Sequence, residues 1–160
     1  ETALQWWQRQ PAAAGLFANQ RGPYYDLWAL RHPKLCPDDI WAAMLQRHGA
    51  QPELSDAQLL DAVYVPRMFS LSPQEAPLEV DSAFGGLGIY RREFITPSCK
   101  YVGLEPSGLE TCEHVSFNES VGASGGRLFV VPGLINVGEI PLTSQYQDFM
   151  RIITQGGSQQ

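Results

Sequence analysis

Positive charge is scarce in this sequence. It contains 11 lysines and arginines against 17 aspartates and glutamates, which gives a formal net charge of −6. Only two of the basic residues are lysines, Lys34 and Lys100. Binding to nucleic acid or to an anionic membrane requires clustered Lys and Arg side chains. We therefore expect no nucleic acid partner and no attraction to an anionic lipid surface.

Cysteine is also rare. The 3 cysteines, Cys36, Cys99 and Cys112, are an odd number and include no Cys-x-x-Cys pair. Disulfide-rich scaffolds and structural zinc sites both depend on paired cysteines, so the sequence argues against either. Reduced thiols and a cytoplasmic location are the simpler expectation, and Cys112 is predicted to be a packed thiol.

Long hydrophobic runs are absent. No stretch approaches the roughly 20 apolar residues of a membrane-spanning helix, and no basic-then-apolar secretory leader opens the chain. We therefore expect a soluble protein with no membrane-spanning segment. The sequence begins at Glu1 rather than at methionine, which is compatible with a piece of a longer protein.

The composition is that of one globular domain. The 160 residues are 44% hydrophobic and 18% charged, which is enough to bury a single core. We assign residues 1–155 to a single α/β domain. The Gly/Ser/Gln-rich residues 156–160 are expected to form a disordered tail. The sequence does not predict the oligomeric state.

Short apolar segments between turn residues predict strands at 13–19, 24–30, 78–90 and 127–137. The first two are expected to be neighbours in one sheet. The third is interrupted by Phe84-Gly85-Gly86, and the fourth carries Pro132, which predicts an edge or a bend in its middle. Paired glycines in a strand indicate that another backbone or a ligand comes very close, although a plain bulge explains them equally well.

Helical signals lie between these strands. A short helix should end before Pro11, a second should cover 37–48 with Pro37 in its first turn, and a third should start at Ser55 and end at Pro66. Further helices are predicted from Thr111, as the N-cap, to the glycines at 122–126, and over 144–153. Alternating strands and helices predict an α/β fold with a mixed sheet flanked by helices.

Four segments together resemble a known family. They are NQRGPYYDLWALRHP at 19–33, DSAFGGLGIYRREF at 81–94, CEHVSF at 112–117 and GGRLFVVPGLINV at 125–137. The last three are similar to the acceptor half of the GT-A glycosyltransferases. With the first, they resemble the subgroup related to fungal capsule-associated mannosyltransferases.

The resemblance implies part of a GT-A, nucleotide-diphospho-sugar transferase-like fold. It also implies transfer of a hexose from a nucleotide sugar to a glycan or cell-surface acceptor, with divalent manganese or magnesium as cofactor. Two features depart from the family pattern. The Asp-x-Asp metal motif of the donor half is not in this chain, and His114 stands where the family has an aspartate that serves as base.

The residues expected to act follow from this resemblance and from their chemistry. Sugar transfer requires a group that holds the leaving diphosphate and, in inverting enzymes, a base for the acceptor hydroxyl. Glu113, at a helix start that favours its charged form, is the first choice of base. His114 is the first choice of metal ligand, although it could also serve as the base. Asp81, with Gly85 and Gly86 beside it, is expected to contact the acceptor or a sugar.

An aromatic ring beside a carboxylate is a frequent sugar-binding surface, so Asp26, Trp28 and Arg31 are further substrate-binding candidates. Arg91 or its neighbour Arg92 could reach a phosphate or the acceptor, but not both, since they alternate faces. A core tryptophan with a paired Asp and Arg is the plainer explanation of the first three residues.

Two other classes of protein remain. A carbohydrate-binding or scaffold domain that kept the fold and lost the chemistry is favoured by the missing metal motif. A dehydrogenase is disfavoured because no G-x-G-x-x-G is present. An α/β hydrolase is disfavoured because the G-x-S-x-G match at 122–126 stands between a predicted helix and a predicted strand, the reverse of the strand-to-helix order that such a motif requires.

Overall fold

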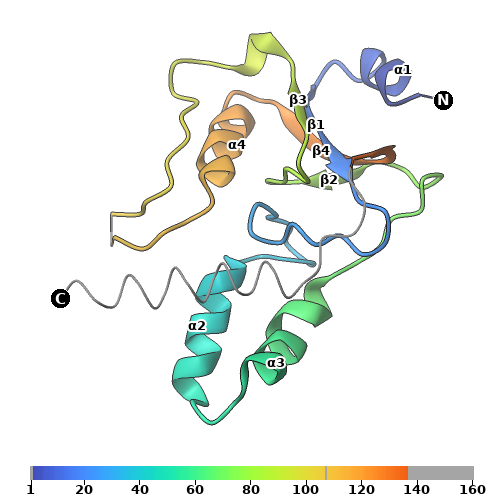
Figure 1. The fold of residues 1–160 in the computed structure, drawn as a ribbon. Helices are drawn as coiled ribbons and strands as arrows, with labels where there is room; N and C mark the ends of the chain where they lie inside the picture. The colour runs from blue at the N-terminus through green and yellow to red at the C-terminus, as the bar shows by residue number, and fades with distance from the viewer. Residues whose placement is uncertain (1, 107, 137–160) are drawn as a thin grey trace.

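The computed structural model describes residues 2–106 and 108–136. The helix expected at 144–153 and the tail expected at 156–160 lie outside the described residues. The described part is a mixed α/β fold built on a four-stranded sheet in the order β2-β4-β1-β3 (Figure 1). The strands are β1 (Ala13–Asn19), β2 (Leu78–Val80), β3 (Gly88–Tyr90) and β4 (Arg127–Ile135). The predicted α/β class and mixed sheet are confirmed.

The two central strands run parallel and the two edge strands run against them. β1 pairs with β4 in parallel, whereas β3 pairs with β1 and β2 pairs with β4 antiparallel. The strand predicted over 78–90 is therefore two short strands at opposite edges of the sheet. The chain between them, which carries the paired glycines, crosses from one edge to the other.

Side chains on the two faces of the sheet enter different apolar clusters. One face belongs to a cluster of buried residues that also includes residues of α4 (Glu113–Ala123) and α2 (Ile40–Ala50): Ala14, Phe17, Ile40, Met44, Phe117, Val121, Leu128 and Val130. The other face carries Leu16 and Phe129 and is covered by α1 (Ala3–Gln8), whose Trp6 meets the Phe129 ring edge-on at 5.1 Å. Figure 1 shows α1 and α4 on opposite sides of the sheet.

The segment Tyr24–Leu30 is not a strand, so the prediction of a sheet neighbour for β1 was wrong. Its residues form turns, although Tyr24, Leu27 and Leu30 are fully buried. The Leu27 N–H donates to the Tyr25 carbonyl at 2.8 Å, and the Asp26 carboxylate accepts from the backbone N–H of Ala29. Such local bonds from an aspartate compete with sheet pairing. The aromatic content of this segment reflects burial rather than strand structure.

Helix starts follow their caps more closely than their prolines. α2 begins at Ile40 instead of Pro37, because Asp39 is its N-cap and accepts from the N–H groups of Trp41 and Ala42. The predicted capping box of Ser55 and Gln58 is present at α3 (Asp56–Leu59). The helical path then continues as a π-turn over Leu60–Tyr64 and a 3₁₀ turn over Val65–Arg67, one residue past Pro66. At α4 the N-cap is Cys112 rather than Thr111, and it makes no side-chain capping bond.

Pro132 lies in an interior strand, so the edge alternative was wrong and the bend is confirmed. Opposite Ala18 and Asn19 of β1, the register of β4 jumps from Val131 to Ile135. The pairing of β4 with β2 has already ended at Val130. Proline, which has no N–H to donate, is tolerated at such a break in the ladder.

No helix in the described ranges combines the length and the apolar character needed to span a bilayer.

An exposed ion pair links β2 to β4 and gives a first prediction. The Arg127 guanidinium donates to both carboxylate oxygens of Glu79, at 2.7 and 2.5 Å, and this hydrogen bonding lowers the pKa of Glu79 below its usual 4.5. A lowered folded-state pKa adds stability above the unfolded pKa, and this stability is lost as the pH falls through the folded value. Glu79→Gln should therefore reduce the unfolding free energy near neutral pH, and the difference should shrink as the pH is lowered through 4.5.

Denaturant unfolding at several pH values measures this difference. Glu53→Gln is the control, because Glu53 is exposed and has no ion pair within the described residues. A pH-independent loss for Glu79→Gln would show that the ion pair is not its cause.

Candidate functional site

The chain from Asp81 to Gly86, here called the glycine segment, reaches the carboxyl ends of both parallel strands. The Gly85 carbonyl accepts from Gln20 Nε2 at 3.1 Å and from Asn136 Nδ2 at 3.2 Å. Gln20 follows β1 directly and Asn136 follows β4 directly. In open α/β sheets, ligands are bound outside the carboxyl ends of the strands, so this is the edge where a site is expected.

Gly85 has to be a glycine for a reason that the structure makes explicit. Its φ is +66°, and a Cβ atom at this position would overlap the carbonyl oxygen of Ala18 in β1. Of the alternatives left open by the sequence, the close approach of another backbone is therefore the one observed. Gly86 also has a positive φ, +81°, but it is exposed, and its added Cβ would meet the flexible Asn136 side chain.

Asp26 holds the glycine segment from the opposite side. Its Oδ2 accepts the Gly85 N–H at 2.7 Å, and its carboxylate also accepts the Ala29 N–H. Burial raises the pKa of Asp26, whereas these two bonds and the neighbouring His114 act in the opposite direction. A carboxylate with two backbone donors is suited to fixing a loop, and Asp26 acts here as an anchor for Gly85.

Asn118 fixes the glycine segment to α4. It is fully buried, and its Nδ2 donates to Ser82 Oγ at 2.9 Å and to the Ala83 carbonyl at 3.0 Å. Its Oδ1 accepts from the Tyr90 hydroxyl of β3 at 2.7 Å. These three bonds set the position of α4 relative to the glycine segment.

The first turn of α4 consequently faces Phe84. The His114 imidazole stacks on the Phe84 ring with centroids 4.0 Å apart, and it packs nearly perpendicular to the Tyr101 ring with centroids 5.4 Å apart. His114 Nδ1 lies 3.3 Å from Glu113 Oε1 and 3.8 Å from Cys112 Sγ. The Glu113 side chain is 43% exposed and that of His114 is 17% exposed. Glu113 can therefore meet a ligand from solvent, while His114 is oriented by rings on two sides.

The structure brings four of the nine predicted site residues into one cluster. Asp26, Gly85, Glu113 and His114 are linked through the Asp26–Gly85 bond and the Phe84–His114 stack, and Asp26 interacts electrostatically with both Glu113 and His114. Trp28 borders this cluster, packed with Phe84 against Cys112. Its Nε1 is buried and has no partner among the described residues. Its expected place on a strand face beside Asp26 was wrong, because that strand is absent.

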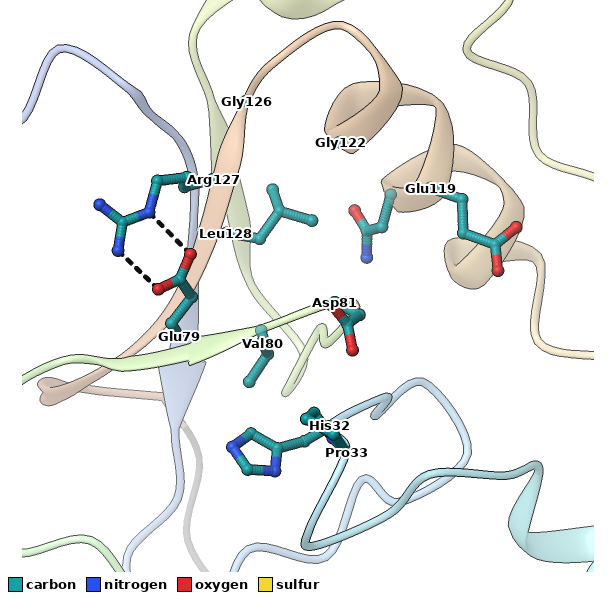
Figure 2. Close-up of a pocket in the computed structure, with 11 residues that line it drawn as sticks. His32, Pro33, Glu79, Val80, Asp81, Glu119, Gly122, Gly126, Arg127 and Leu128 are labelled. Atoms are coloured by element: carbon teal, nitrogen blue, oxygen red, sulfur yellow. Dashed lines mark hydrogen bonds and ion pairs between the residues drawn. The ribbon is translucent and has the colours of Figure 1, made fainter.

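Asp81 lies in a separate groove. Figure 2 shows its carboxylate at the end of β2, between α4 and the loop that carries His32. The groove has a volume of about 500 Å³ and is also lined by Glu119, Gly122 and Leu128. Glu113 and His114 are not among its lining residues. Any contact of Asp81 with a sugar would therefore be made in a place distinct from the Glu113–His114 cluster.

The two predicted arginines make structural contacts. Arg31 pairs with Asp39 at 2.8 Å and donates to the carbonyls of Trp28 and Leu30. Arg91 donates to the carbonyls of Trp7 and Ala13 and lies over the Trp7 ring at 4.8 Å. Arg91 thereby ties α1 to the sheet, on the side away from α4. Arg92 is exposed and bonds the Ile95 carbonyl.

Sequence reasoning missed Phe84, Tyr101 and Asn118. Asn118 had a usable signal, since it follows His114 by four residues and so shares its helix face. Phe84 was noticed only as the neighbour of two glycines. Tyr101 lies in an irregular segment of the chain, where no periodic pattern marks it.

The residues beside His114 allow a test of the expected metal. One sulfur, one nitrogen and one carboxylate oxygen, from Cys112, His114 and Glu113, lie within 4.8 Å of one another. Magnesium requires near-octahedral oxygen ligands, and manganese also prefers carboxylate, carbonyl and water oxygens. A group with a thiol, an imidazole and a single carboxylate does not fit either ion. Burial raises the pKa of the Cys112 thiol to about 12.

Comparison of the chain with models of protein families, with curated proteins and with solved structures gives no match.

The contacts of Gly85 give a second prediction. Gly85→Ala should lower the unfolding free energy by about 3 kcal/mol, because it combines a left-handed φ with an overlap against β1. Gly125→Ala is the matched control: its φ is +85°, but nothing lies within 4 Å of the added Cβ, so it should cost only about 1 kcal/mol. Chemical denaturation of both variants measures the difference. Equal losses would mean that the backbone contact with Ala18 does not constrain this position.

Proposed function

We propose that this chain is the acceptor-side part of a GT-A glycosyltransferase, which transfers a hexose from a nucleotide sugar to a glycan or cell-surface acceptor. The observation that supports it best is that three of the segments that resemble the family meet at one place. The glycine segment carries Phe84 to the ring of His114, and Asp26 of the 19–33 segment bonds to Gly85.

Glu113 is the residue we assign to the acceptor hydroxyl. In an inverting transfer the acceptor O–H bond breaks as the new bond to the anomeric carbon forms, and the nucleotide diphosphate departs. The base needs an accessible lone pair, and the Glu113 carboxylate is 43% exposed at the first turn of α4. A carboxylate in this position can take the proton of an acceptor hydroxyl that approaches from solvent.

Tyr101 supplies the aromatic surface that the sequence led us to expect from Trp28. One face of its ring stacks on Phe117 at 4.6 Å, and the residue remains 56% exposed beside His114. An aromatic ring can cover the apolar face of a sugar while a nearby carboxylate takes its hydroxyl groups. Tyr101 and Glu113 together form such a pair.

The donor sugar and its diphosphate require groups outside this chain. The sequence contains no Asp-x-Asp motif, and the metal-ligating group around His114 does not suit magnesium or manganese. No step of the transfer is therefore assigned to a metal held by these residues. The same two observations favour one rival, a carbohydrate-binding domain that retains the acceptor surface without the chemistry.

The assignment of Glu113 gives a third prediction. In a longer protein that includes the donor half, Glu113→Gln should lower the transfer rate of labelled hexose at least about 100-fold, as expected for loss of a general base. Glu110→Gln, an exposed glutamate three residues earlier, should leave the rate unchanged. A Glu113→Gln protein with normal activity would remove Glu113 from the mechanism. If no nucleotide hexose is transferred by the unaltered long protein, the catalytic proposal fails.

The fourth prediction concerns acceptor binding and separates the enzyme from its rival. Tyr101→Ala should weaken binding of a mannose oligosaccharide to this chain roughly tenfold, since a stacked aromatic ring contributes about 1.5 kcal/mol. Val102→Ala, at the neighbouring exposed position, should bind like the unaltered chain. Calorimetric titration measures both. Binding retained in a long protein that shows no transfer would support the carbohydrate-binding domain, and undiminished binding by Tyr101→Ala would exclude this surface.

A further inference from the structure

We propose that Cys112, Glu113 and His114 bind a single zinc ion, with one coordination position left open to solvent. The proposal rests on the positions of their ligand atoms and is independent of sugar transfer. The Cys112 sulfur, one Glu113 carboxylate oxygen and one His114 ring nitrogen all lie within 4.8 Å of one another. The resemblance implied manganese or magnesium. The thiol, imidazole and carboxylate of these residues indicate zinc instead.

Two of the three separations between the ligand atoms match those of a tetrahedral zinc site. Zinc–sulfur bonds of about 2.3 Å and zinc–nitrogen or zinc–oxygen bonds of about 2.05 Å, at tetrahedral angles, place S and N about 3.6 Å apart and N and O about 3.4 Å apart. The structure has Cys112 Sγ at 3.8 Å and Glu113 Oε1 at 3.3 Å from His114 Nδ1. The remaining separation, between the Cys112 sulfur and the Glu113 carboxylate oxygen, is no more than 4.8 Å.

The ligands are three consecutive residues, and the helix start is what allows them to converge. Within a regular helix, residues i and i+2 point to different sides. Cys112 is the N-cap, with an extended backbone of φ −66° and ψ 118°, so its side chain turns back beside His114. The same three residues in the middle of a helix would not form a metal site.

The surroundings hold the ligands in place. His114 is held between Phe84 and Tyr101, and α4 is bonded to the glycine segment through Asn118. Burial raises the pKa of the Cys112 thiol, so a zinc ion has to displace the thiol proton in order to bind the sulfur. Asp26 adds a further carboxylate that interacts with Glu113 and His114.

Three protein ligands with an exposed fourth position describe an open zinc site rather than a closed structural one. Cys112 is buried, with only 4% of the residue exposed, whereas the Glu113 side chain is 43% exposed. The open position therefore lies on the solvent side, next to Glu113. Because zinc would engage the carboxylate that we assign as the base, it should inhibit transfer; this consequence, unlike zinc binding itself, rests on the proposed function.

Titration of the reduced chain with zinc, followed by competition with a chromogenic chelator, tests the site. We expect one high-affinity equivalent per chain that millimolar magnesium or manganese does not displace. Titration with cobalt(II) should give the intense visible absorption of a tetrahedral ion and a sulfur-to-cobalt charge-transfer band. The cobalt spectrum requires no variant, so it does not depend on how a variant folds.

Variants then assign the ligands. Cys112→Ala and His114→Gln should each weaken zinc binding more than about tenfold and, for Cys112→Ala, abolish the charge-transfer band. Cys99→Ala and His48→Gln, which alter a thiol and an imidazole elsewhere, should bind as the unaltered chain does. Circular dichroism checks that each variant is folded.

The proposal is overturned if the reduced chain binds no zinc, if cobalt shows no thiolate band, or if Cys99→Ala loses as much affinity as Cys112→Ala. Zinc binding without transfer activity in a longer protein would leave the site standing and count against the proposed function. Transfer activity without zinc binding would support the proposed function and overturn the zinc site.

Discussion

Asn118 is the residue on which the arrangement of this molecule depends most. A primary amide buried without partners would cost several kcal/mol, so the fold has to supply hydrogen bonds for it. Ser82, Ala83 and Tyr90 do so, and they come from both sides of the crossing between β2 and β3. The position of α4 is thereby set by polar groups, which have stricter geometric requirements than apolar packing. The contact between His114 and Phe84, one helical turn earlier, is a consequence of this fixed position.

Gly85 is the second point at which backbone geometry leaves little freedom. Its N–H is bound by Asp26 and its carbonyl by Gln20 and Asn136, so both peptide groups are satisfied by side chains rather than by a sheet ladder. Burial raises the pKa of Asp26, which means that folding works against its negative charge. Asp26 nevertheless accepts two backbone N–H groups, and these bonds hold the loop that faces α4.

The sequence predicted well those features that are decided locally. β1 was located to the residue, the capping box at Ser55 was found, and the paired glycines marked a true close approach. The strand over 24–30 failed because aromatic residues are favoured both by strands and by buried turns, and only the bonds of Asp26 distinguish the two. Of the site, Glu113 and His114 lie together because they are neighbours in sequence. Asp81, Arg31 and Arg91 lie apart from Glu113 and His114, because their surroundings are set by distant segments that no local pattern encodes.

The two proposed activities also differ in whether they need adjacent residues or distant segments. Every ligand of the proposed zinc site comes from three adjacent residues, so the site requires only that α4 start where it does. Sugar transfer, in contrast, needs the glycine segment, α4 and a diphosphate-binding half to be assembled around one acceptor hydroxyl. A metal at Glu113 and a proton accepted by Glu113 use the same lone pairs and exclude each other. Under the two proposals, Glu113 therefore has two exclusive states, one bound to zinc and one free to accept a proton. The zinc concentration would decide which state is populated.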